Sequence, residues 1–115
     1  MRRGDLYWVD LEPTRGSEAN ETRPAVIVSN DAANRAVERT RRGVVTVVPV
    51  TSNTDRVRSF QVLLAAGDAG LTRESKAQAE QVRWVDAARL RGRIGALPPD
   101  ALRHLDAALR THLSV

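Results

Sequence analysis

Short apolar runs along the chain predict a protein built mainly of β-strands. Residues 5–10 alternate between apolar and polar side chains, which is typical of a half-buried strand. Residues 43–50 hold five valines and are apolar on both faces, so we expect this strand to lie at the centre of a sheet. The expected strands cover residues 5–10, 24–30, 43–50, 59–64, 77–85 and 93–95.

Helical patterns are shorter and fewer. Residues 98–113 predict a C-terminal helix, because Pro98 and Pro99 open a segment whose leucines then recur at helical spacing. Residues 31–42 predict one or two helical turns before a solvated loop, and Asp86 is placed to cap a further helical turn. Residues 11–23 form a long polar loop, which compact domains seldom keep without a use. Antiparallel strands, small helical inserts and a closing helix favour a small curled barrel.

Length and composition limit the classes of protein. The 115 residues predict one domain, 1–115, with one core. No apolar run approaches the ~20 residues that span a bilayer, and the first residues lack the apolar stretch of a secretory signal. We therefore expect a cytoplasmic protein without a membrane segment.

Candidate chemistry is limited by what the sequence lacks. There is no cysteine, and the two histidines, His104 and His112, fall off the middle of the apolar stripe of the C-terminal helix. Phosphate-loop, dinucleotide, zinc-protease and esterase motifs are all missing. The sequence thus predicts neither a metal nor a cofactor.

The charge balance points towards a polyanion. Net charge is +4, and 17 of the 18 basic residues are arginine, whose planar guanidinium grips phosphate and stacks on bases. A GC-rich coding sequence also produces many arginines and alanines, so composition alone leaves both explanations open.

Polar side chains collect where the expected strands begin and end. Each of these residues alone is typical of a solvated loop, a turn cap or the solvent-exposed face of an edge strand. Only their occurrence together, in a basic chain, argues for function. These residues are Ser17, Glu18, Arg23, Thr51, Ser52, Asn53, Ser75, Lys76, Gln78, Glu80 and Gln81.

Six sequence blocks, taken together, resemble the MazF/PemK family of toxin endoribonucleases. They occur in the family's order and at the family's spacing, over residues 4 to about 113. The blocks are residues 4–11 (GDLYWVDL), 15–18 (RGSE), 23–30 (RPAVIVSN), 48–53 (VPVTSN), 60–64 (FQVLL) and 80–83 (EQVR).

The resemblance implies a fold and an activity. The fold would be an SH3-like antiparallel barrel, mainly β with short helices and closed by a C-terminal α-helix. The activity would be metal-independent cleavage of single-stranded RNA, whether mRNA, tRNA or rRNA, to 2′,3′-cyclic phosphate and 5′-hydroxyl ends. A homodimer and a cognate MazE-like antitoxin are implied as well. The alternatives are a non-catalytic RNA-binding barrel and a gyrase-binding toxin of the CcdB type, although the C-terminus lacks the Trp-Gly-Ile ending of the latter.

Carried over by position, the resemblance implies a catalytic group of Arg23, Thr51 and Glu18. An acidic residue that some members place near the entry of a strand could correspond to Glu74 or to Ser75, and this choice stays open. The residues expected to bind substrate are Ser17, Asn30, Ser52, Asn53, Ser75, Lys76 and Gln81.

These residue types suit RNA cleavage through the 2′-hydroxyl. That reaction needs a proton removed from the 2′-oxygen, charge stabilised on the phosphate and a proton for the leaving 5′-oxygen. Arg23 can bind the phosphate bidentately, and Thr51 can hydrogen-bond a phosphoryl oxygen. Glu18, or a water that it positions, is a reasonable base, but the sequence assigns neither base nor acid. We also expect arginines of residues 35–42 and 56–58 to flank the RNA groove.

Overall fold

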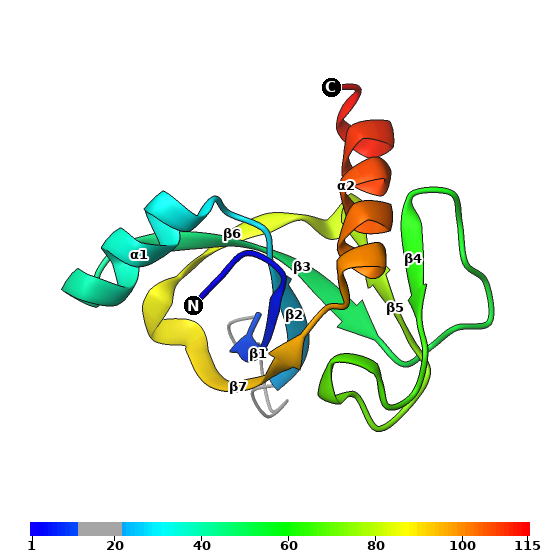
Figure 1. Cartoon of the computed structure of the whole chain (residues 1–115), viewed down its shortest axis with the longest axis horizontal. Helices are drawn as coiled ribbons and strands as arrows, with labels where there is room; N and C mark the ends of the chain where they lie inside the picture. The colour runs from blue at the N-terminus through cyan, green and yellow to red at the C-terminus, as the bar shows by residue number, and fades with distance from the viewer. Residues whose placement is uncertain (12–21) are drawn as a thin grey trace, which may run out of the picture.

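The computed structural model describes residues 1–11 and 22–115 (Figure 1). Its strands are β1 (Asp5–Asp10), β2 (Thr22–Ile27), β3 (Val44–Thr51), β4 (Gln61–Leu64), β5 (Ser75–Gln78), β6 (Arg83–Asp86) and β7 (Leu90–Ala96). Its helices are α1 (Asp31–Thr40) and α2 (Pro99–Leu113), with the 3₁₀ turns η1 (Asp68–Gly70), η2 (Ala79–Gln81) and η3 (Ala87–Arg89). No described helix is long and apolar enough to cross a membrane.

The described strands form one antiparallel sheet, in the order β4-β5-β3-β2-β1-β7. The valine-rich strand β3 is central, as predicted: it pairs with β2 along one edge, and with both β6 and β5 along the other. The predicted class, a mainly β fold with a C-terminal helix, is confirmed. The sheet curls, but within the described residues no pairing joins its end strands β4 and β7, so the barrel is not closed.

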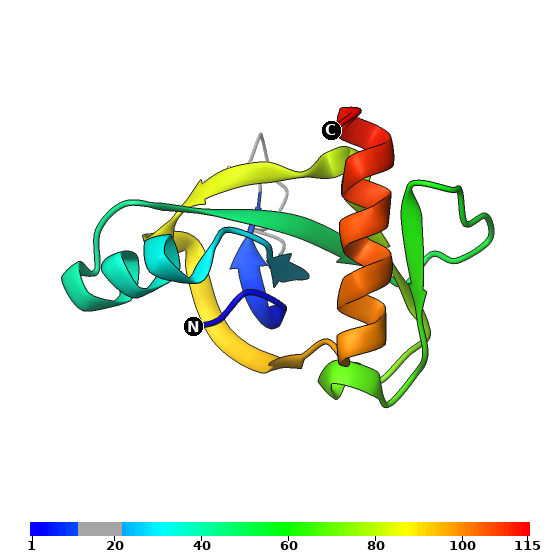
Figure 2. The ribbon, with the colours of Figure 1, turned by 45° about the horizontal axis from the view of Figure 1, so that its top comes forward.

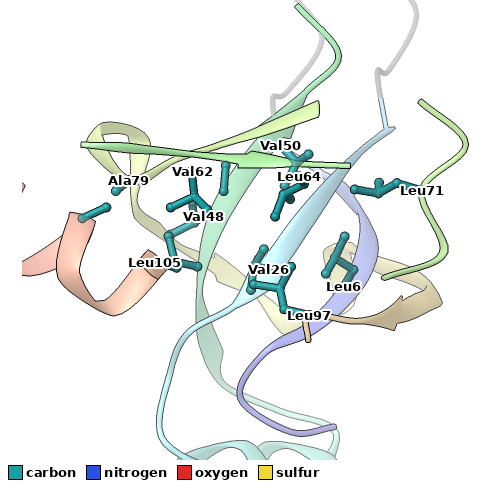
Figure 3. Packing of buried hydrophobic residues seen from close by; sticks show 12 residues of the cluster. Leu6, Val26, Val48, Val50, Val62, Leu64, Leu71, Ala79, Leu97 and Leu105 are labelled. Carbon is teal, nitrogen blue, oxygen red and sulfur yellow. The ribbon is translucent and has the colours of Figure 1, made fainter. Parts of the chain in front are cut away.

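The side chains of β3 belong to two hydrophobic clusters, one on each face of the sheet, because successive side chains of a strand point to opposite faces. Val45 and Val47 join a cluster with the buried residues Val9, Leu11, Ala25, Ile27, Val37 and Val85. Val48 and Val50 join the other cluster, which includes Leu6, Val26, Leu64 and Leu105 (Figure 3). A strand that is apolar on both faces is therefore needed at this position.

Helix α2 runs alongside the curled sheet (Figure 2). It packs on the sheet through the predicted stripe. Leu105 and Ala108 are buried, and Leu102 and Leu109 pack partly against the same cluster. Leu113, at the end of the stripe, is 50% exposed. Both histidines of α2 are exposed, as expected from their place beside the stripe.

Two sequence-based expectations about secondary structure were wrong. Residues 77–85 do not form one strand: β5 pairs with the end of β3 and β6 with its beginning, and η2 carries the chain from one to the other. Helix α1 is longer than one or two turns, with ten residues. Asn30 caps its N-terminus by accepting a 2.8 Å hydrogen bond from the Ala33 N–H.

Candidate functional site

Arg23 and Thr51 come together at one end of the sheet. Strands β2 and β3 are antiparallel, and their pairing ends at Ala25 opposite Pro49. If the same register is extended by two residues, Arg23 falls opposite Thr51. Both residues lie an even number of positions from that pair, which places their side chains on the same face. Arg23 is exposed and Thr51 is half-buried. A guanidinium and a hydroxyl thus lie just beyond the same end of the β2–β3 pairing, and both are accessible to solvent.

The Thr51 hydroxyl is held in place by the turn that follows β3. Its Oγ1 accepts a 3.2 Å hydrogen bond from the Asn53 N–H, and Asn53 Oδ1 in turn accepts one from the Asp55 N–H. A hydroxyl has one proton to donate and two lone pairs. Thr51 can therefore cap the turn and still donate its proton to a phosphoryl oxygen.

Strand β5 adds a cation beside this pair. Lys76 is directly opposite Thr51, and its Nζ donates a 2.5 Å hydrogen bond to the backbone carbonyl of Arg56. This bond ties the segment after β3 to β5, and it keeps the Arg56 backbone near the strand ends. The neighbouring Ser75 is buried, and its Oγ donates to the Arg73 carbonyl at 3.0 Å.

The predicted site residues divide between the two faces of the sheet. Strand alternation places Lys76 on the face of Thr51 and places Ser75 on the other. Ser75 and Ser52 both line a hollow of ≈ 220 Å³ on that second side. The structure thus gathers Arg23, Thr51, Ser52, Ser75 and Lys76 at one end of the sheet, but around its edge rather than on one surface.

Other predicted residues lie elsewhere. Asn30 follows the opposite end of β2, where it caps α1. Gln81 is in η2, where its Oε1 accepts a 3.2 Å hydrogen bond from Arg83 Nη2. Ser17 and Glu18 lie outside the described residues.

The expected flanking arginines also divide. Arg56 and Arg58 follow Thr51, but Arg35, Arg39, Arg41 and Arg42 lie on or just after α1, at the far end of β3. The eight-residue β3 separates the two groups by about 23 Å at a rise of ~3.3 Å per residue. Within one chain, the expectation that both groups flank one groove is therefore wrong.

Glu80 is a carboxylate whose surroundings could not be anticipated. Its Oε2 accepts a 2.8 Å hydrogen bond from Gln61 Nε2, while its Oε1 is buried without a hydrogen-bond partner among the described residues. A buried oxygen of this kind calls for an explanation, and the described residues supply none. The sequence offered only a polar alternation that also fits an exposed edge strand. Glu74, one of the two residues left open, is exposed and accepts a 3.3 Å hydrogen bond from Thr54 Oγ1.

Comparisons with known proteins identify the family of the chain. Residues 2–113 match the family model described as PemK-like, MazF-like toxin of type II toxin-antitoxin system. The chain is 55% identical to "Endoribonuclease MazF9" of Mycobacterium tuberculosis, over all of this chain and 98% of that one. Its structure resembles MazF (Form-I) of Deinococcus radiodurans, with a TM-score of 0.79 and 27% identity over all of this chain and 97% of that one.

A second similar structure is that of a complex. It is MazE-MazF (Form-II) from Deinococcus radiodurans, which matches with a TM-score of 0.80 and 26% identity, over all of this chain and 96% of that one. The family resemblance that the six blocks predicted is confirmed over nearly the whole sequence. The chain belongs to the PemK-like, MazF-like family of toxins of type II toxin-antitoxin systems.

Proposed function

We propose that the chain cleaves single-stranded RNA without a metal, by attack of the RNA's own 2′-hydroxyl on a phosphate bound between Arg23 and Thr51. That it is an endoribonuclease toxin follows from its family and from its 55% identity to an endoribonuclease of matching length. The observation that supports the assignment of the site is the β2–β3 register, which would set Arg23 opposite Thr51 if it were extended by two residues beyond Ala25 and Pro49.

Each residue has a separate role in the proposed reaction. The Arg23 guanidinium binds the non-bridging phosphate oxygens and stabilises the charge that grows on them as the 2′-oxygen attacks. Thr51 donates a hydrogen bond from its hydroxyl to one of these oxygens. The bond to the 5′-oxygen then breaks, leaving a 2′,3′-cyclic phosphate and, after protonation, a 5′-hydroxyl.

Proton transfer needs a group other than arginine, whose pKa above about 12 makes it a poor base. Glu18 remains the candidate from the sequence. Glu80 is tested beside it because one of its carboxylate oxygens is buried with no hydrogen-bond partner among the described residues, although it follows the end of β5 that is away from Lys76 and Thr51. A Glu80→Gln variant and a Glu18→Gln variant distinguish the two, since only the base should change the acidic limb of the pH–rate profile.

The partners follow from the same family. A toxin of a type II system has a cognate antitoxin, and the MazE-MazF complex from Deinococcus radiodurans supports a MazE-like one for this chain. We propose that the active form is a homodimer in the cytoplasm, and that Ser52, Asn53 and Lys76 contact the RNA beside the phosphate.

The test is cleavage of a defined single-stranded RNA in excess EDTA, with Arg23→Ala and Arg39→Ala compared at equal thermal stability. Arg39 is a matched control, because it is an exposed arginine on α1 at the far end of β3. Arg23→Ala should lose about 10²-fold or more in rate, as when one donor to a developing charge is removed. The products should carry 2′,3′-cyclic phosphate, and a 2′-deoxy nucleotide at the cleaved bond should stop the reaction. Cleavage that needs a metal, or an active Arg23→Ala protein, would refute the proposal.

A further inference from the structure

The hollow of ≈ 220 Å³ opens at the same end of β2 and β3 as Arg23 and Thr51, on the other face of the sheet. Pro24, which follows Arg23, and Val50 and Ser52, which flank Thr51, all belong to its lining. Whatever occupies the hollow is therefore one residue away, along two different strands, from the groups that bind the phosphate. The complete lining is Trp8, Pro24, Val50, Ser52, Gly70, Leu71, Thr72, Arg73, Ser75 and Ile94.

Trp8 is the aromatic wall of this hollow. It lies on β1 opposite Pro24 of β2 and Gly92 of β7, and its side chain is 45% exposed. Large aromatic residues ordinarily bury most of their surface, so an indole left open beside a hollow is available to a ligand. Stacking on such a ring suits any nucleobase, because every base has a π-face.

The remaining lining combines an apolar floor with polar groups. Leu71, which belongs to the hydrophobic cluster of Figure 3, contributes to the apolar part together with Val50 and Ile94. The hydroxyl of Ser75 is buried, with the residue only 5% exposed, and Arg73 brings a cation. An apolar hollow with a few convergent polar groups is typical of a small-molecule site. A cavity of about 150 Å³ holds benzene, so this hollow has room for a heteroaromatic ring.

The part of the lining that η1 and β7 form is closely packed. The turn η1 packs against β7 so closely that a Cβ on Gly70 would lie 2.5 Å from the Ile94 carbonyl oxygen. Gly95 makes an equally close approach to the backbone of Ala69. Only glycines allow this contact, which fixes the hollow before any ligand arrives.

We propose that this hollow binds the base of a nucleotide adjoining the scissile phosphate, stacked against Trp8 with its polar edge facing Ser52, Arg73 and Ser75. The inference rests on the proposed function and names a specificity-determining subsite for it. It explains why the predicted residues divide between two faces: the RNA backbone passes the strand ends at Arg23 and Thr51, and the adjacent base turns into the hollow.

The first test uses the two tryptophans of the chain as separate reporters. A Trp84→Phe protein retains only Trp8, and a Trp8→Phe protein retains only Trp84, which lies on β6 and is 68% exposed. Each is titrated with RNA made uncleavable by a 2′-deoxy nucleotide at the cleaved bond. The fluorescence of Trp8 should be quenched and that of Trp84 should not. Quenching of Trp84 alone, or quenching of Trp8 by an acidic antitoxin peptide but not by RNA, would overturn the proposal.

The second test is a double-mutant cycle on RNA affinity. One change is Trp8→Ala in the protein, and the other is an abasic nucleotide in the RNA, placed in turn on each side of the cleaved bond. Stacking of one base changes binding by about 5- to 150-fold. If the hollow takes that base, removing the base should weaken the binding of Trp84→Phe protein by this factor, and should weaken Trp8→Ala no further. Trp8→Phe keeps an aromatic platform and should retain most of the affinity for intact RNA.

The outcomes separate this inference from the proposed function. If the parent protein fails to cleave the RNA in excess EDTA, the proposed function itself is wrong; Trp84→Phe is used for binding only if it retains the parent's cleavage rate. If the RNA is cleaved, but Trp8→Ala and the abasic nucleotide weaken binding by independent factors at both positions, only the base subsite is wrong.

Discussion

Gly95→Ala tests the wall of the hollow without touching a side chain proposed to contact RNA. The new Cβ would lie 2.6 Å from the carbonyl carbon of Ala69 and closer still to its oxygen. Carbon atoms in contact prefer about 3.5–4.0 Å, so η1 must move away from β7 by about 1 Å. The obstructing atoms are backbone, which cannot rotate aside as a flexible side chain can.

Overpacking of this kind costs about 1–3 kcal/mol, and the closeness of the backbone places Gly95→Ala in the upper half of that range. At roughly 4 °C per kcal/mol for a chain of this size, the midpoint of thermal unfolding should fall by about 8–12 °C. The same displacement moves Gly70, which lines the hollow, away from Ile94 on β7. Binding of uncleavable RNA should therefore weaken at temperatures where the variant is still folded.

Gly92→Ala is the matched control, because Gly92 is on the same strand and a Cβ there meets nothing within 4 Å. Its unfolding midpoint should match or exceed that of the parent protein, since alanine is less costly to order than glycine. Circular dichroism melts at one protomer concentration provide the comparison, because association makes the midpoint depend on concentration. Equal midpoints for the two variants would show that η1 does not pack on β7 as described.

Three further predictions concern the proposed site. Thr51→Ser should retain most of the cleavage rate and Thr51→Ala should lose about 10²-fold; equal losses in single-turnover assays would show that the methyl group matters instead of the hydroxyl. Asn30→Ala should lower stability by about 1 kcal/mol in urea melts and leave the KM for RNA unchanged, whereas a raised KM at unchanged stability would make Asn30 a substrate contact. Neutralising Arg56 and Arg58 should make the slope of log K for RNA binding against log salt concentration less steep, by about 0.7 for each phosphate that the protein no longer neutralises. Arg39→Gln should leave this slope unchanged for a short RNA.

The parts of this fold that the sequence predicts best are those set by local pattern. The valines of β3 and the leucine stripe of α2 have only one arrangement that buries them, and both elements are found where expected. The break at η2 could not be predicted, because it depends on β3 having β5 as a partner at one end and β6 at the other. Within residues 77–85 nothing marks the change of partner.

The candidate site shows the same division between local and long-range information. Arg23 and Thr51 could be named from the six blocks, and their proximity follows once β2 and β3 are known to be antiparallel neighbours. The hollow could not be found in this way, because its walls come from β1, β2, β3, β7 and the segment around η1. Such a site exists only after distant segments have packed.

The arginine content, which first suggested a polyanion, divides into groups with different roles. Some arginines pair with carboxylates inside the fold: Arg91 lies 3.5 Å from the buried Asp10, and Arg93 lies 3.4 Å from the buried Asp5. A buried carboxylate is destabilising unless it is paired, so these arginines on β7 are explained by the structure of the protein itself. Net charge therefore overstates the surface available to RNA. What makes the strand end around Arg23 a candidate site is the coincidence of a guanidinium, a hydroxyl and a preformed hollow within one or two residues, a property of the register and not of composition.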